Sequence, residues 1–281
     1  MVTPFHEDGS VNLGKVKELC EWHIAQGTDG IVALGTTGES STMTHEEDDE
    51  VAQCVLDTVA GRIPVIVGSG SNCTQTAIES SKRYAAMGAD GLLVITPYYN
   101  KANDQGMIRH FESVADAVDI PITLYNVPGR TGCSIAPHVV ERLSRHPHIN
   151  GIKEASGDIG YVAKIARYIS DDFAVVSGND NMIVPVMSLG GTGVISVFAN
   201  LCPDICKDIT SSWLRGDVQR AKELQLKYLE LIDTLFVEVN PIPVKEAMNM
   251  RGMDIGGFRL PLCEMADANR EKLRRAMEVL V

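Results

Sequence analysis

Gly91-Leu92-Leu93-Val94-Ile95 is a continuous apolar run, and the chain turns polar only after Thr96-Pro97. A strand without alternating polar residues is typical of a parallel sheet that is covered on both faces. Six similar runs occupy residues 30–34, 63–67, 120–124, 149–152, 173–176 and 193–197. Met1-Val2-Thr3 offers one further, very short strand, which would bring the expected number to eight.

The segments between these runs have helical patterns. Residues 13–24, 51–59 and 159–169 each repeat apolar side chains at the spacing of one helix face. Thr44-His45-Glu46-Glu47 has the pattern of a capping box, which predicts a helix start. Helices are expected to end near three glycines, Gly27, Gly88 and Gly216.

The order of these elements predicts an α/β fold of the (β/α)8 type, a TIM barrel. Consecutive strand starts are 20 to 33 positions apart, which is the size of one strand–helix unit. We expect the barrel strands and helices in residues 1–202, and the last barrel helix with a helical C-terminal extension in residues 203–281. The alternative is a doubly wound open sheet, but Gly35-Thr36-Thr37-Gly38-Glu39 lacks the Gly-rich fingerprint that usually follows its first strand.

Composition excludes several classes of protein. The net charge is −12 and no Lys/Arg cluster appears, which argues against a nucleic-acid partner. No apolar run approaches the roughly 20 residues of a membrane span, and the first residues do not read as a secretory signal. Seven cysteines without paired spacing indicate reduced thiols that pack in the core of a cytoplasmic protein, and no zinc site is expected.

Polar side chains follow several of the strands. Active sites of such barrels lie at the C-terminal ends of the strands. Here these ends carry 35–42, which begins with Gly35-Thr36-Thr37-Gly38, then Tyr98-Tyr99 and Tyr125-Asn126-Val127-Pro128-Gly129-Arg130. A Gly-rich turn with hydroxyls can bind a carboxylate, although an ordinary turn explains it nearly as well. Three tyrosines and one arginine at a single barrel mouth are harder to explain by packing.

Lys153 is the sharpest candidate residue. It follows the apolar run 149–152, whereas most other lysines lie in polar helical contexts. A buried amine is more readily held neutral, and a neutral amine is a nucleophile for carbonyl carbons. The alternative from these residues alone is a lysine at a strand end that reaches into solvent.

Taken together, the motifs resemble the pyruvate-dependent class I aldolase superfamily. Residues 35–39, Tyr125-Asn126-Val127-Pro128 and Gly151-Ile152-Lys153-Glu154 stand in its order and spacing. Within it the chain looks like the dihydrodipicolinate synthase branch, because of Thr36-Thr37, 97–100, Arg130 and Asn240-Pro241-Ile242-Pro243-Val244-Lys245. The resemblance covers nearly the whole chain.

The resemblance implies a lyase that forms a Schiff base and needs no cofactor or metal. Lys153 would capture pyruvate as an imine, whose enamine would attack L-aspartate 4-semialdehyde and lead to 4-hydroxy-tetrahydrodipicolinate, in lysine and diaminopimelate biosynthesis. Tyr125, Thr36 and Tyr99 would relay protons. Thr37 would hold the pyruvate carboxylate, Arg130 the carboxylate of the semialdehyde, and Gly178 and Ile195 would line the pyruvate pocket.

The same resemblance implies a homo-oligomer, a tetramer of two tight dimers in which Tyr99 reaches the neighbouring subunit's site. It also implies a possible lysine-effector cleft formed by Ser40, Ser41, His45, Asn72 and Tyr98. Asp48 and Thr76 depart from the pattern of strongly regulated members, so weak or absent inhibition by L-lysine is expected.

Two other functions stay open at this point. The first is a sister aldolase that acts on a 2-keto-3-deoxy sugar acid, against which Arg130 argues. The second is a non-catalytic barrel that senses small molecules, which would be expected to lose the lysine or the tyrosines.

Overall fold

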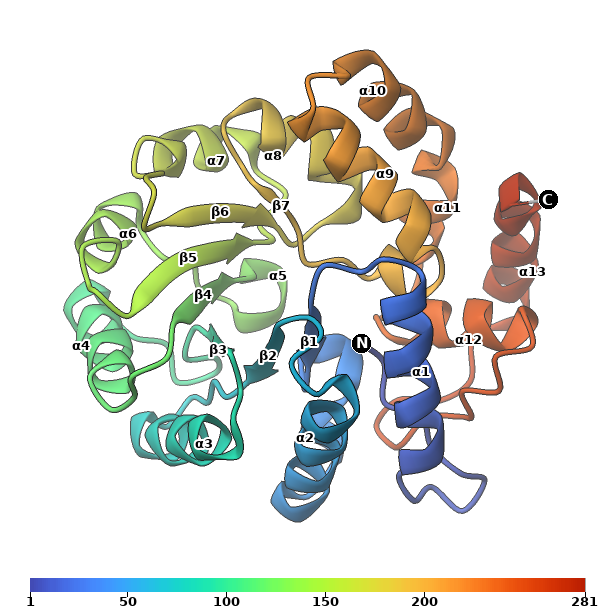
Figure 1. Ribbon diagram of the computed structural model, residues 1–281, viewed down its shortest axis with the longest axis horizontal. Coiled ribbons are helices and arrows are strands. Elements are labelled where there is room, and N and C mark those ends of the chain that lie inside the picture. Colours follow the sequence, from blue (N-terminus) through green and yellow to red (C-terminus); the bar gives the residue numbers. More distant parts are fainter. Residues whose placement is uncertain (281) are drawn as a thin grey trace. The chain divides into compact units, whose positions relative to one another are not determined.

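The computed structural model describes residues 1–280, which form two compact units. The terminal unit comprises residues 1–63 together with the chain from Ser196 onward, and the central unit comprises Pro64–Ile195. Figure 1 shows the helices and strands of both. Within residues 1–280, no helix is both long and apolar enough to cross a membrane.

The central unit is built on a parallel sheet in which each strand pairs with the next along the chain. Its strands are β2 (Val65–Gly68), β3 (Gly91–Ile95), β4 (Ile122–Asn126), β5 (Ile149–Glu154), β6 (Ala174–Ser177) and β7 (Gly193–Val194). The connecting helices are α3 (Thr74–Met87), α4 (Asp104–Ala115), α5 (Pro128–Thr131), α6 (Pro137–Leu143), α7 (Ile159–Ala166), the short η3 (Asp180–Met182) and α8 (Ile183–Ser188). Helices α3, α4, α6, α7 and α8 follow one side of the sheet (Figure 1).

The continuous apolar runs explain this sheet. Leu92, Leu93 and Val94 of β3 are buried in succession, with at most 3% of each residue exposed. Side chains on successive residues point to opposite faces, so a strand buried at every position must be covered on both sides. Because all the strands run the same way, the segments that follow them lie at one edge of the sheet.

The terminal unit combines the start of the chain with its last helices. The first part contains α1 (Leu13–Ala25), β1 (Ile31–Ala33), η1 (Thr36–Gly38), η2 (Ser40–Thr42) and α2 (His45–Val59). The second part contains η4 (Phe198–Asn200), α9 (Pro203–Leu214), α10 (Val218–Lys227), α11 (Leu229–Thr234), α12 (Ile242–Met250), α13 (Asp267–Ala276) and η5 (Met277–Leu280).

The expected α/β fold with a parallel sheet is confirmed, but residues 1–280 form seven strands and not eight. Met1-Val2-Thr3, the expected additional strand, is not one. The Met1 amino group donates to the Val32 carbonyl of β1 over 2.8 Å, but the Val2 amide donates to the Asn200 side chain and not to a strand. The run 193–197 is likewise extended only at Gly193–Val194, because the chain turns into η4 shortly afterwards.

The predicted helix signals are confirmed. Thr44 and Glu47 form the capping box at the start of α2, with both reciprocal hydrogen bonds present. Gly88 caps α3 in the left-handed conformation, and Gly27 and Gly216 follow the C-caps of α1 and α9 with positive φ. The expected division of the chain at residue 202 stays a prediction.

Candidate active site

Lys153 and Tyr125, the two residues predicted to carry the chemistry, lie side by side in the central unit. Lys153 is on β5 and Tyr125 on β4, and the parallel register pairs them directly. The Nζ atom of Lys153 lies 4.4 Å from the centre of the Tyr125 ring. Tyr125 is buried and Lys153 is half-buried. An amine that can add to a carbonyl carbon therefore stands next to a phenol that can exchange protons.

The next strands leave space beside the lysine. Gly178 directly follows β6, and its amide donates to the Glu154 carbonyl over 2.7 Å. A Cβ atom at Gly178 would lie 3.1 Å from Cε of Lys153 and 2.7 Å from Cβ of Ala155, so a larger residue would press on the lysine side chain. Ile195, the other predicted lining residue, is tied to β6 by its amide, which donates to the Ser177 carbonyl over 2.9 Å.

A buried carboxylate joins β4 and β5 on the face opposite to the Lys153–Tyr125 pair. Asn126 Nδ2 donates to Glu154 Oε2 over 2.7 Å, and the Ser156 amide donates to Oε1 over 2.6 Å. Burial raises the pKa of the Glu154 carboxyl. This pair was not predicted from the sequence, although its position was a signal: Asn126 follows Tyr125 and Glu154 follows Lys153, so strand alternation turns both away from the site.

Asn126 also closes the loop that carries Arg130. Its Oδ1 atom accepts hydrogen bonds from the Ile135 amide at 3.0 Å and the Ser134 hydroxyl at 3.3 Å. The Tyr161 hydroxyl donates to the Ile135 carbonyl over 2.6 Å, and burial raises the pKa of this phenol. The segment between β4 and Ile135 therefore begins and ends at one buried asparagine, which holds α5 next to the strand of Tyr125.

The loop after β3 places its tyrosines at the surface of the chain. Tyr99 has φ of 68° and a side chain that is 91% exposed, whereas Tyr98 is 39% exposed. The Asn100 side chain anchors the loop by donating to the Asn72 carbonyl over 2.8 Å. Arg130 is also exposed. Tyr99 and Arg130 thus follow strands of the same sheet edge, but this single chain does not bury Tyr99 against Tyr125.

Thr36 and Thr37, the other predicted site residues, belong to the terminal unit and are both half-buried. They open η1, and Glu39 follows in the left-handed conformation with φ of 55°. The Thr37 hydroxyl accepts a hydrogen bond from Asn240 Nδ2 over 2.9 Å. The sequence placed Asn240 in a motif but predicted no role for its side chain.

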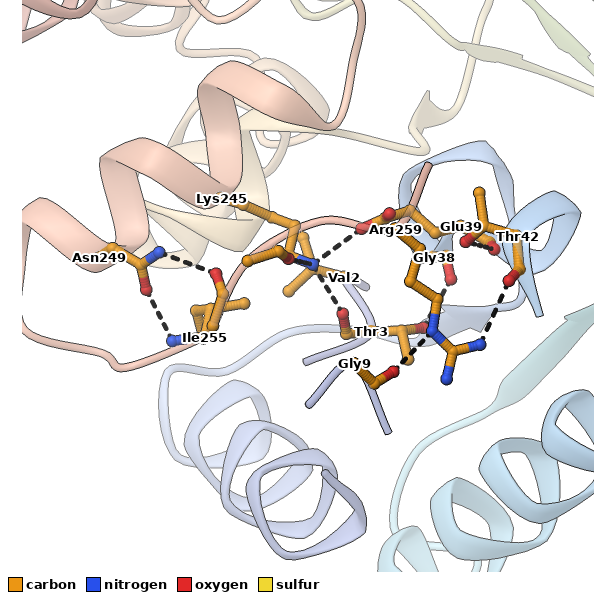
Figure 2. A network of polar contacts seen from close by, with 12 residues as sticks. Val2, Thr3, Gly9, Gly38, Glu39, Thr42, Lys245, Asn249, Ile255 and Arg259 are labelled. Atoms are coloured by element: carbon orange, nitrogen blue, oxygen red, sulfur yellow. Dashed lines mark hydrogen bonds and ion pairs between the residues drawn. The ribbon is translucent and has the colours of Figure 1, made fainter. Parts of the chain in front are cut away.

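A completely buried ion pair holds Glu39, the residue that follows η1 (Figure 2). Lys245 Nζ lies 2.8 Å from Glu39 Oε1, and both side chains have no exposed surface. Lys245 also donates to the carbonyls of Thr3 at 3.1 Å and Gly257 at 2.6 Å. Burial lowers the pKa of Lys245, and the Glu39 carboxylate opposes that shift. This completely buried lysine was not predicted from the sequence, where its neighbours are the apolar Val244 and the acidic Glu246.

Arg259 extends the same network. Its guanidinium binds both carboxylate oxygens of Glu47 at 2.6 Å, and its Nε donates to the Gly9 carbonyl over 2.7 Å. The hydrogen bond from Arg259 lowers the pKa of Glu47 to about 2. The guanidinium also lies 4.6 Å from the centre of the Phe5 ring. The start of the chain, the start of α2 and the segment before α13 are therefore fixed together.

The residues of the proposed effector cleft are divided between the units. Ser40 Oγ donates to the buried Asp48 carboxylate over 3.1 Å, while Ser41 and His45 are exposed. Asn72 and Tyr98 belong to the central unit. Asp48 is thus held by a residue of its own unit.

All seven cysteines are free thiols, but they do not all pack in the core. Cys73 and Cys263 are exposed, which corrects the prediction for these two. Cys73 stands before the first turn of α3, and Cys263 lies in the extended segment before α13, so neither has a helix or sheet face to bury it. In the part of the chain that is described, residues 1–280, no three His, Cys, Asp or Glu side chains gather in a group that could hold a metal ion.

Comparison with known proteins gives one consistent result. The model of the "Dihydrodipicolinate synthetase family" matches residues 1–280. The 4-hydroxy-tetrahydrodipicolinate synthase of Caldicellulosiruptor saccharolyticus is 53% identical over 277 residues, which are 99% of this chain and 94% of the relative.

Two solved structures are similar over 99% of this chain. One is the chloride-inhibited dihydrodipicolinate synthase of Acinetobacter baumannii complexed with pyruvate, with 42% identity, a TM-score of 0.96 and 96% of its own chain covered. The other is the enzyme of Cyanidioschyzon merolae with lysine bound, with 39% identity, a TM-score of 0.96 and 95% coverage.

The Lys245–Glu39 pair predicts a large loss of stability when one partner is removed. In Lys245→Met the Glu39 carboxylate keeps its buried position without its cation, so we expect the free energy of unfolding to fall by about 3–5 kcal/mol. Urea unfolding followed by circular dichroism measures the change. Removing the charge of both partners in Glu39→Gln/Lys245→Met should recover part of it. The exposed Lys222→Met in α10 is the control, and a Lys245 variant as stable as this control would refute the role of the pair.

Proposed function

The chain belongs to the dihydrodipicolinate synthetase family, and we propose that it works through an imine between Lys153 and pyruvate. It is a lyase that condenses pyruvate with L-aspartate 4-semialdehyde to 4-hydroxy-tetrahydrodipicolinate, in lysine and diaminopimelate biosynthesis. The observation that carries the imine is the position of Lys153, half-buried and 4.4 Å from the Tyr125 ring. Gly178 supports it, because the absent side chain leaves space around the lysine.

The first half of the reaction makes pyruvate a nucleophile. The neutral amine of Lys153 adds to the ketone carbon, the oxygen leaves as water, and a carbon–nitrogen double bond remains. The protonated imine withdraws electrons from the neighbouring methyl group, which loses a proton and becomes an enamine. Tyr125 is the acid and base for these transfers, and such proton transfer typically contributes about 10²–10⁴-fold. The lysine itself supplies the electrophilic activation that a cofactor would otherwise provide.

The second half joins the substrates and frees the enzyme. The enamine carbon attacks the aldehyde carbon of L-aspartate 4-semialdehyde, and a carbon–carbon bond forms as the aldehyde oxygen becomes a hydroxyl. The amino group of the same substrate then displaces Lys153 from the imine carbon. The ring closes and the neutral lysine is regenerated.

Thr36 and Tyr99 complete the proton relay with Tyr125. Tyr99 is 91% exposed in one chain, which supports a role in the site of a neighbouring subunit. We therefore propose a homo-oligomer, a tetramer of two tight dimers, which sedimentation velocity would measure. We also propose a closed (β/α)8 barrel, because the chain belongs to this family. The TM-score of 0.96 to a solved relative supports this proposal.

Four further residues contact the substrates. Thr37 holds the pyruvate carboxylate, while Gly178 and Ile195 line the pyruvate pocket. Arg130 binds the carboxylate of the semialdehyde, a task suited to its planar guanidinium. The exposed position of Arg130 beyond the end of β4, the strand of Tyr125, supports this assignment.

The imine is tested by trapping. Borohydride reduction in the presence of pyruvate should add one reduced pyruvate group per chain, on the peptide that contains Lys153. Mass spectrometry of the digested protein locates the group, and Lys153→Arg, which keeps the charge but has no primary amine, should remain unmodified. An adduct on Lys101 or Lys245 would overturn the assignment.

The role of Arg130 is tested by steady-state kinetics. Arg130→Ala removes a charge-assisted hydrogen bond worth about 1.5–3 kcal/mol, so the KM for the semialdehyde should rise roughly 10- to 100-fold. Imine formation with pyruvate should persist, because it precedes binding of the second substrate. Loss of borohydride trapping in this variant would instead give Arg130 a structural role.

Ser40, Ser41, His45, Asn72 and Tyr98 form a proposed effector cleft that responds weakly or not at all to L-lysine. The relative of Cyanidioschyzon merolae was solved with lysine bound. In this chain Asp48 already accepts a hydrogen bond from Ser40, and Thr76 offers no charge to an ammonium group. A dose–response with L-lysine at fixed pyruvate measures the effect, and half-inhibition below about 0.1 mM would contradict the expectation.

A further inference from the structure

Asn240 contacts the hydroxyl group that the proposed function assigns to pyruvate binding. Its side chain is buried, with 5% of the residue exposed, and precedes α12 by two positions. Nδ2 donates to Oγ1 of Thr37 over 2.9 Å, across 203 positions of sequence. Both residues lie in the terminal unit.

This contact determines whether the Thr37 hydroxyl can donate or accept its next hydrogen bond. A hydroxyl has one proton to donate and two lone pairs that accept. The amide N–H of Asn240 occupies a lone pair, so the proton of Thr37 remains available for an acceptor elsewhere. An ionised carboxylate only accepts hydrogen bonds. The Asn240 amide thus leaves the Thr37 hydroxyl able to donate a hydrogen bond, and a carboxylate oxygen can accept it.

We propose that Asn240 is a positioning residue, whose amide directs the Thr37 hydroxyl proton toward the carboxylate of pyruvate. The inference rests on the proposed function, in which Thr37 holds that carboxylate. Donation by the amide also polarises the Thr37 hydroxyl and strengthens the bond that it donates in turn.

The backbone of the loop is held independently of Asn240. The Thr3 hydroxyl donates to the Gly38 carbonyl over 2.6 Å, and Lys245 binds the side chain of Glu39 (Figure 2). These contacts fix the two residues that follow Thr37. Removing the Asn240 amide therefore frees the hydroxyl to reorient while the loop keeps its path.

The test compares two replacements of similar size. Asn240→Leu removes the donor, and Asn240→Asp replaces it with an acceptor that captures the Thr37 proton. We expect the KM for pyruvate to rise several-fold in the first and about 10- to 100-fold in the second, with a smaller change in kcat. Asn249→Leu is the matched control. Asn249 lies on α12 and its side chain bonds Gly256 and Ile255, so this variant should lose stability without a change in the KM for pyruvate.

A double-mutant cycle with Thr37→Val separates the hydroxyl from other effects. Once the hydroxyl is gone, Asn240→Leu should cost no further affinity, whereas a general structural role would cost the same in both backgrounds and would overturn the proposal. If Asn240→Leu does not fold, Asn240→Asp completes the cycle. Unchanged affinity in Thr37→Val would also overturn it.

Borohydride trapping of the unaltered protein distinguishes failure of the proposed imine from failure of the proposed role of Asn240. Failure to trap pyruvate on Lys153 would refute the proposed imine itself. Normal trapping, together with an Asn240 variant whose KM for pyruvate is unchanged, would refute only the role of Asn240.

Discussion

The ion pair of Lys245 with Glu39 is the contact on which the terminal unit depends. All three protons of the ammonium group have acceptors: the Glu39 carboxylate and the carbonyls of Thr3 and Gly257. The three acceptors come from the start of the chain, the loop after β1 and the segment after α12. A buried charge without its partners costs several kcal/mol. Displacing any one of these segments would therefore remove an acceptor from the Lys245 ammonium group and destabilise the contacts of the other two. The loop that presents Thr36 and Thr37 is therefore anchored by electrostatics.

Two lysines of this chain, Lys245 and Lys153, have different polar surroundings. Lys245 has a carboxylate and two carbonyls within hydrogen-bond distance, which commits every proton to the structure. Lys153 has the face of a phenol ring beside it and, among the described residues, forms no ion pair. The two amines therefore differ in the number of hydrogen-bond acceptors around them, and this difference is consistent with the imine that we propose for Lys153.

The sequence predicted the features that depend on local patterns. The strands were visible as apolar runs, the start of α2 as a capping box, and Lys153 as a lysine at the end of a buried strand. Partners that are distant in sequence were not visible in this way. Asn240 and Thr37 are 203 positions apart, and Lys245 and Glu39 are 206 apart, so no periodicity connects them. The expected strand at Met1–Thr3 failed for the same reason, because the amide of Val2 is taken by Asn200.

Strand alternation turns the two side chains of Tyr125-Asn126, and those of Lys153-Glu154, to opposite faces of the sheet. In each pair the first residue belongs to the proposed catalytic face, and the second joins the two strands by the bond between Asn126 and Glu154. Residues that are adjacent in sequence thus lie on opposite faces of the sheet. A substitution at Tyr125 or Lys153 can therefore leave the bond between Asn126 and Glu154 intact, so the two strands keep their register. The reverse does not hold, because Asn126 also closes the loop that carries Arg130, so a change at Asn126 would disturb both faces.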